Sequence, residues 1–122
     1  MNIKTSYFGS KAPAERKVCI AKKCPKFCEC MAFPDFAPLD PFSDGDWRAR
    51  YQAELHERYP DAQSLRKALD FILDVVEAPI LCCYERDRSE CHRDILARYI
   101  EQHLGFEVPE WAQPKQHSLL EW

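Results

Sequence analysis

The chain is short of glycine, with only three among its 122 residues. Three scattered glycines cannot build a glycine-rich phosphate loop, which excludes nucleotide binding through a motif of that kind. Long hydrophobic runs are also missing, because no stretch approaches the roughly 20 apolar residues that a membrane span requires. The N-terminus has neither the basic head nor the apolar segment of a signal peptide. We therefore expect a cytoplasmic protein without a membrane partner.

Cysteine, in contrast, is plentiful. The chain holds seven cysteines, an odd number that cannot all pair within one molecule. In a cytoplasmic protein such a set indicates metal binding or thiol chemistry rather than a framework of structural disulfides.

The net charge of −3 conceals an uneven distribution of charged residues. Residues 1–30 carry seven Lys and Arg against two Asp and Glu, residues 31–62 carry three against seven, and residues 63–122 seven against eleven. The basic residues between positions 4 and 26 could hold an anionic small molecule or nucleic acid. A solvated basic face that pairs with acidic neighbours explains the same pattern, and both interpretations stay open. Oligomeric state is not indicated.

Two periodicities alternate along the chain, one typical of strands and one of helices. The expected strands cover residues 3–8, 17–21 and 79–84, and the expected helices cover residues 47–59, 61–76 and 90–104. Asp44 or Asp46 is expected to cap the first helix, Asp61 the second, and Asp87 or Ser89 the third. The helix beginning at Trp47 carries its apolar residues at every fourth position, and the next helix has the clearest amphipathic pattern of the three.

These elements predict a single α/β domain over residues 1–122, a small and mainly parallel sheet layered with about three helices. Residues 22–42 contain four prolines and three cysteines and are expected to form an irregular Cys/Pro-rich loop. Only about eight residues join the first two strands, so an antiparallel hairpin at that point stays open. Residues 109–122 are expected to be a docked tail, anchored by Trp111, Leu119, Leu120 and Trp122.

One group of chemically reactive residues lies where the third strand ends and the third helix begins. It consists of Cys83, Glu85, Cys91, His92 and Arg93. In the first turn of a helix, free backbone N–H groups and the helix dipole favour anions and lower the pKa of a thiol. Cys83 or Cys91 would be nucleophile or ligand, Glu85 a general base, and Arg93 a fork for phosphate or carboxylate. Each residue alone could equally be structural.

The same residues carry a family resemblance. The segment Leu81-x-Cys83-Tyr84-Glu85-x5-Cys91-His92-Arg93 resembles the signature block of the domain of unknown function 488 family. Phe36-Ala37-Pro38 and the helix after it are similar to that family in outline. The resemblance implies a compact α/β fold and a site in this block. It implies no particular reaction or substrate.

A second group of cysteines lies in the Pro-rich loop, with the spacing Cys19-x4-Cys24-x3-Cys28-x-Cys30. Thiolates at this density suit zinc or an iron–sulfur cluster, and a bound metal would explain how so long a loop is held. The spacing is not that of paired Cys-x2-Cys zinc motifs, and free thiols or a redox pair are the alternatives.

The sequence thus favours a metal-binding enzyme, with zinc or an iron–sulfur cluster, acting on an anionic and possibly nucleotide or nucleic-acid substrate. One alternative is a non-catalytic, metal-stabilised module that binds nucleic acid or protein. Another is a thiol redox protein that uses Cys83 with Cys91 or Cys82.

Overall fold

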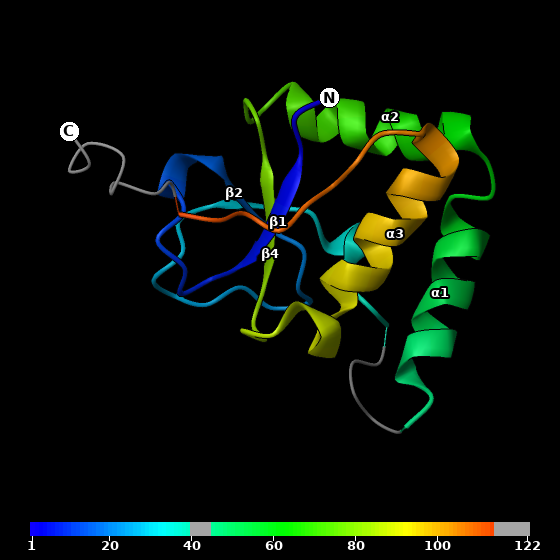
Figure 1. The fold of residues 1–122 in the computed structure, drawn as a ribbon, viewed down its shortest axis with the longest axis horizontal. Helices are drawn as coiled ribbons and strands as arrows, with labels where there is room; N and C mark the ends of the chain where they lie inside the picture. Colours follow the sequence, from blue (N-terminus) through cyan, green and yellow to red (C-terminus); the bar gives the residue numbers. More distant parts are fainter. Residues whose placement is uncertain (40–44, 114–122) are drawn as a thin grey trace, which may run out of the picture.

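A computed structural model describes residues 1–39 and 45–113 of the chain. Figure 1 shows a sheet with three helices gathered on one side and irregular segments on the other. The strands are β1 (Lys4–Tyr7), β2 (Lys17–Cys19), β3 (Met31–Ala32) and β4 (Ile80–Cys83). The helices are α1 (Trp47–Arg58), α2 (Ala62–Leu73) and α3 (His92–Leu104), and the short 3-10 turns are η1 (Ala14–Arg16), η2 (Pro34–Phe36) and η3 (Arg88–Glu90). The prediction of a small α/β fold is confirmed.

The four strands of the described residues are all parallel, in the order β1-β4-β2-β3. The last strand in sequence, β4, lies between the first two and pairs Tyr7 with Cys83 on one side and Cys19 with Cys82 on the other. The first two strands therefore run parallel without touching, and the hairpin that the short connection left open does not form. The Cys/Pro-rich loop is irregular as predicted, except that it supplies the short edge strand β3 and the turn η2.

Side chains of the sheet alternate between two separate cores, as the pleat of a strand requires. Val18, Leu81 and Cys83 belong to the larger core, which packs against the helices. Cys19 and Cys82 belong to a smaller core beneath residues 8–30. All four residues of β4 are buried, because one face meets helices and the other meets the loops. Neighbouring cysteines of one strand thus face different surroundings.

Local sequence explains where the helices begin and end. The predicted stripe on α1 is confirmed, since Trp47, Tyr51 and Leu55 are buried together with Tyr59 just beyond the helix. Asp61 caps α2 by accepting a hydrogen bond from the Ser64 backbone N–H at 2.7 Å. Asp46 occupies the N-cap position of α1 without a side-chain cap bond, and Asp44 lies outside the described residues.

The start of α3 differs from the prediction. Asp87 accepts hydrogen bonds from the backbone and hydroxyl of Ser89, which caps the separate turn η3 and not the long helix. The helix itself begins at His92, with Cys91 at its N-cap position, and ends at Gly105 in the left-handed conformation (φ 75°). Cys91 and His92 therefore stand at the very opening of α3.

The first part of the predicted tail is docked on the sheet. Glu110 forms a parallel bridge with Thr5 of β1, supported by the Trp111 backbone N–H donating to the Thr5 carbonyl at 2.7 Å. Trp111 itself packs against the smaller core. The other expected anchors, Leu119, Leu120 and Trp122, lie outside the described residues. No helix among the described residues has the length and apolar character needed to cross a membrane.

Candidate functional site

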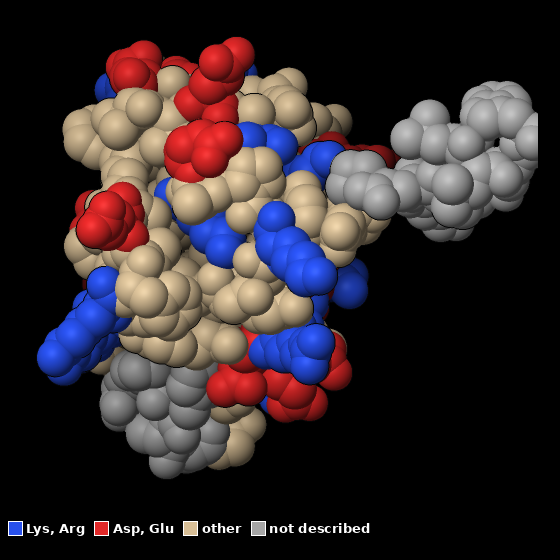
Figure 2. Space-filling model, turned by 90° about the vertical axis from the view of Figure 1, so that its left-hand side faces the viewer, with Lys and Arg blue, Asp and Glu red and all other residues tan. Residues whose placement is uncertain are grey.

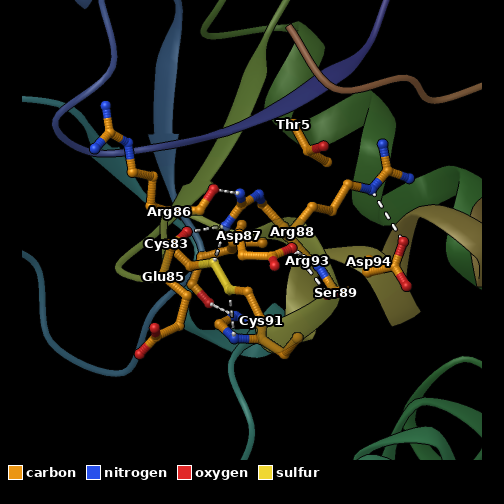
Figure 3. The surroundings of a disulfide bond; sticks show 12 residues. Thr5, Cys83, Glu85, Arg86, Asp87, Arg88, Ser89, Cys91, Arg93 and Asp94 are labelled. Carbon is orange, nitrogen blue, oxygen red and sulfur yellow. Dashed lines mark hydrogen bonds and ion pairs between the residues drawn. A yellow bond between two sulfur atoms is a disulfide. The ribbon is translucent and has the colours of Figure 1, made fainter.

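The sulfur atoms of Cys83 and Cys91 meet where β4 ends and α3 begins. The two residues form a disulfide in the structure (Figure 3). Both side chains are buried, with 1% of each residue exposed. The predicted convergence of strand end and helix start therefore brings two of the five expected site residues into direct contact.

His92 completes the centre from the first residue of α3. Its Nε2 lies 2.7 Å from the carbonyl oxygen of Ile20, and its Nδ1 lies 3.8 Å from the Cys91 sulfur. A carbonyl only accepts, so Nε2 must carry the proton and Nδ1 must present its lone pair to the sulfur. The ligand atoms of Cys83, Cys91 and His92 all lie within 4.8 Å of one another, which no other group of three or more metal-binding side chains in the described residues does.

Burial sets the protonation of this histidine. Desolvation, only partly offset by the hydrogen bond to Ile20 and reinforced by the nearby Arg93 charge, lowers the pKa of His92 to about 4. The imidazole is thus neutral at physiological pH while the two sulfurs are joined. Its Nδ1 therefore carries a lone pair and no proton.

Stability should therefore depend on pH through His92. The unfolded histidine has a pKa near 6.5 and the folded one about 4, so only the unfolded chain gains a proton between these values. The free energy of unfolding should fall as pH drops from 6.5 to 4, by about 3 kcal/mol from this group. Comparing urea unfolding of the wild type and His92→Gln across that window isolates the effect.

The matched control for that experiment is His56→Gln, because His56 is exposed on α1. Its pH profile should parallel that of the wild type. Superimposable profiles for the His92 variant and the wild type would contradict the depressed pKa. Glutamine is chosen because its amide N–H can still donate to the Ile20 carbonyl.

Arg93 is fully buried, and its surroundings differ from those expected. Its Nε and Nη2 donate to the two carboxylate oxygens of Glu110, at 3.0 and 2.7 Å. Nη2 also donates to the Arg86 carbonyl at 3.0 Å, while Nη1 donates to the Glu85 carbonyl at 2.5 Å and to the Cys83 sulfur at 3.2 Å.

These contacts occupy all five N–H donors of the guanidinium. Arg93 therefore has no donor left to bind an anionic substrate, which corrects the role expected from the sequence. Its contacts instead join the turn after β4 to the docked segment at Glu110, and they place a positive charge beside the Cys83 sulfur.

Glu85 also differs from its expected role. Glu85 is exposed, and it contacts the site through its backbone carbonyl, which accepts a hydrogen bond from Arg93. Figure 3 shows the Glu85 carboxylate pointing away from the two sulfurs. The low-dielectric position expected for a general base is therefore absent, and Glu85 helps to shape the turn through its main chain.

A cleft of about 360 Å³ is lined in part by Cys83 and Cys91, although both residues are almost completely buried. The cleft is lined by the three residues of the centre, by Tyr84 next to Cys83, and by residues of the chain between β2 and α1. These are Cys83, Cys91, His92, Tyr84, Ala21, Lys22, Lys23 and Pro38. The family-like block identified Cys83, Cys91 and His92, whereas sequence reasoning missed Ile20, Glu110 and the cleft walls. No sequence signal links Glu110 to Arg93, because the contact depends on how the chain after α3 returns to β1.

The four cysteines of the loop group are placed in two separate pairs. Cys19 is joined to Cys24 and Cys28 to Cys30, and all four pack against the smaller core. Among the described residues no three of them share a common metal-sized space. Their predicted role as metal ligands stays a prediction.

All seven cysteines lie in the described segments, and Cys82 is the one without a disulfide partner. It is buried in the smaller core. Desolvation raises its pKa to about 12, with small opposing effects from Lys17 and Arg93. A thiol so protonated is a poor nucleophile. This removes Cys82 from the expected choice of partners for Cys83.

Comparison with known proteins adds a family assignment. Residues 33–100, more than half of the chain, match the family described as Domain of unknown function DUF488. The match includes Cys83, Cys91, His92 and the cleft residues Pro38 and Tyr84. No curated protein and no solved structure gave a match.

Proposed function

The chain belongs to the family described as Domain of unknown function DUF488, and we propose that it is a thiol redox protein whose reactive pair is Cys83 and Cys91. The observation that carries this proposal is that the two joined cysteines both belong to the lining of a cleft. Structural disulfides need no cleft, whereas an exchanging pair must be reached by another sulfur.

The surroundings of the two sulfurs support different roles for them. Cys91 stands at the N-cap of α3, where the helix dipole favours a thiolate, and the neutral His92 places its Nδ1 3.8 Å from the Cys91 sulfur, where it can accept a hydrogen bond from the thiol. Cys83 has no such acceptor but has the Arg93 guanidinium at 3.2 Å. We therefore assign Cys91 as the attacking thiol and Cys83 as the resolving thiol.

The exchange balances without a further cofactor. The Cys91 thiolate attacks one sulfur of a substrate disulfide RSSR, forming a Cys91–SR mixed disulfide and releasing RS⁻. The Cys83 thiolate then attacks the Cys91 sulfur, forming the Cys83–Cys91 disulfide and releasing the second RS⁻. The protein loses two electrons, and its two thiol protons pass through water to the two RS⁻ groups, so that RSSR is reduced to two thiols. An external dithiol reverses these steps.

Differential alkylation in dithiol buffers of graded potential tests the proposal. The Cys83–Cys91 pair should change reversibly between the dithiol, which is alkylated, and the disulfide, which is protected from alkylation. The fraction in each form should follow the buffer potential as expected for a two-electron couple. His92→Gln should keep the pair and shift its midpoint. A pair that stays fully reduced or fully oxidised throughout, while the protein remains folded, would argue against a redox role.

Zinc binding at the same centre is the second candidate, favoured by the Cys83, Cys91 and His92 grouping. Two thiolates and one imidazole are a ligand set that zinc accepts, with a fourth position left for water or substrate. The bond from Nε2 to the Ile20 carbonyl is the outer support that metal-bound histidines usually have. Binding would require the reduced pair, because thiolates are the ligands.

Metal analysis of protein purified under reducing conditions separates the sites. Zinc that disappears in Cys91→Ser but persists in Cys28→Ser would assign the metal to this centre. The reverse result would support the loop cysteines Cys19, Cys24, Cys28 and Cys30 as ligands for zinc or an iron–sulfur cluster. If the reduced protein contains no metal and its thiols can be titrated, zinc binding is excluded and the redox function is the candidate that remains.

A further inference from the structure

The cleft above Cys83 and Cys91 has apolar walls and a basic rim. Its lining includes Ala21, Pro38 and Tyr84 together with the exposed residues Lys22 and Lys23, and because this lining is almost wholly apolar the lysines contribute mainly their aliphatic stems to it. No carboxylate is found among the described residues that line it. Its volume of about 360 Å³ is at the small end of the range for ligand sites, which suits a small molecule or a single extended side chain.

Hydrogen bonds hold the walls of this cleft in position. The Tyr84 hydroxyl donates to the Lys23 carbonyl at 2.5 Å, and the Tyr84 ring packs edge-on against Phe8. The Lys22 ammonium donates to the Leu39 carbonyl at 2.9 Å. An ammonium group has three N–H donors, and within residues 1–39 and 45–113 Lys22 uses one of them, for the Leu39 carbonyl.

Basic side chains gather on one face of the molecule. Figure 2 shows Lys and Arg side chains gathered over the middle of the face formed by the N-terminal loops, with Asp and Glu mostly toward its margins. Not every basic residue of this segment is available, since Lys17 is buried and donates to the carbonyls of Phe8 and Ser10. Lys22 and Lys23 are the two cations that line the cleft above the sulfurs.

We propose that the substrate of the thiol pair is a small disulfide, or the thiol formed from it, that carries carboxylate groups. This inference rests on the redox function proposed above and specifies its substrate class. The carbon atoms beside the sulfur lie against Tyr84 and Pro38, and the carboxylate is held by Lys22 and Lys23. In the exchange, R in RSSR is then an anionic alkyl group, and each RS⁻ leaves as a carboxylated thiol.

A charge series of small disulfides tests this directly. Reduced protein is mixed with 3,3′-dithiodipropionate (anionic), bis(2-hydroxyethyl) disulfide (neutral) or cystamine (cationic), and second-order rate constants for oxidation of the Cys83–Cys91 pair are measured. The anionic compound should react fastest, by about tenfold over the neutral one, and this advantage should shrink at high salt.

The variant Lys22→Gln/Lys23→Gln should lose about tenfold in rate with the anionic disulfide and little with the neutral one. The matched control is Lys26→Gln/Lys67→Gln, which removes the same charge from exposed lysines that do not line the cleft. It should keep the preference. The rate with the neutral disulfide reports on folding and on the pair itself in each variant.

Two kinds of failure are distinguishable. If no disulfide oxidises the pair in the wild type, the redox function itself is refuted. If all three disulfides react at equal rates, or if both double variants lose the anionic preference equally, the pair is redox-active and the carboxylated substrate class is refuted.

Discussion

Replacing Arg93 with alanine is expected to lower the free energy of unfolding by about 3–5 kcal/mol, because it removes one partner of a buried ion pair. The guanidinium is completely buried, and its Glu110 partner is 31% exposed. The substitution also leaves the carbonyls of Glu85 and Arg86 without their donor. A loss of this size is a large part of the stability of a domain this small. Urea unfolding monitored by circular dichroism measures it.

The matched control is Arg98→Ala on the same helix. Arg98 pairs with Asp94 at 3.2 Å, but its side chain is 72% exposed, so this loss should stay below about 1 kcal/mol. Equal effects of the two substitutions would contradict the assignment of Arg93 as the residue that joins the turn to the docked segment. Glu110→Gln provides a second check, since it should destabilise the wild type much more than it destabilises the Arg93 variant.

The positions of most elements could be predicted from sequence, because each depends on local patterns. The apolar stretch at Ile80–Cys83 and the glycine stop at Gly105 are examples in which neighbouring residues suffice. The insertion of β4 between β1 and β2 could not be predicted in this way. It depends on which strands share a buried face, and no local pattern encodes that pairing.

The candidate site likewise has features that depend on local sequence and features that depend on distant segments. Cys83, Cys91 and His92 meet because a strand end and the following helix start are close in sequence, so their convergence is partly local. The contacts that give them chemical character come from distant segments. The Ile20 carbonyl fixes the tautomer of His92, and Glu110 holds Arg93. Sequence alone therefore predicted which residues meet at this centre but not the contacts of Arg93 and Glu85.

The pleat of β4 separates two neighbouring thiols that the sequence presents as equivalent. Cys82 points into the smaller core, where burial raises its pKa to about 12. Cys83 points to the other face, where its sulfur meets Cys91 and the guanidinium of Arg93. Adjacent cysteines on one strand thus lie in different surroundings for a geometric reason, and Cys82→Ser becomes a control for any substitution of Cys83.

Serine at position 91 is expected to reduce the rate of disulfide reduction by at least about 10³-fold, because a hydroxyl replaces the attacking thiolate. Serine at position 83 should act differently. It leaves Cys91 able to attack but removes the thiol that resolves the mixed disulfide, so the substrate thiol should stay attached to Cys91. Mass spectrometry of the intact protein after mixing with a small disulfide distinguishes the two variants.

The asymmetry follows from the two environments and not from the disulfide itself. Cys91 has the helix start and the Nδ1 lone pair of His92 at 3.8 Å, whereas Cys83 has only the Arg93 charge. Cys82→Ser should react like the wild type. Adduct formation on Cys83 in the Cys91→Ser protein, with none on Cys91 in the Cys83→Ser protein, would reverse the assigned order. Unchanged reduction rates in both single variants would exclude the pair as the reactive centre.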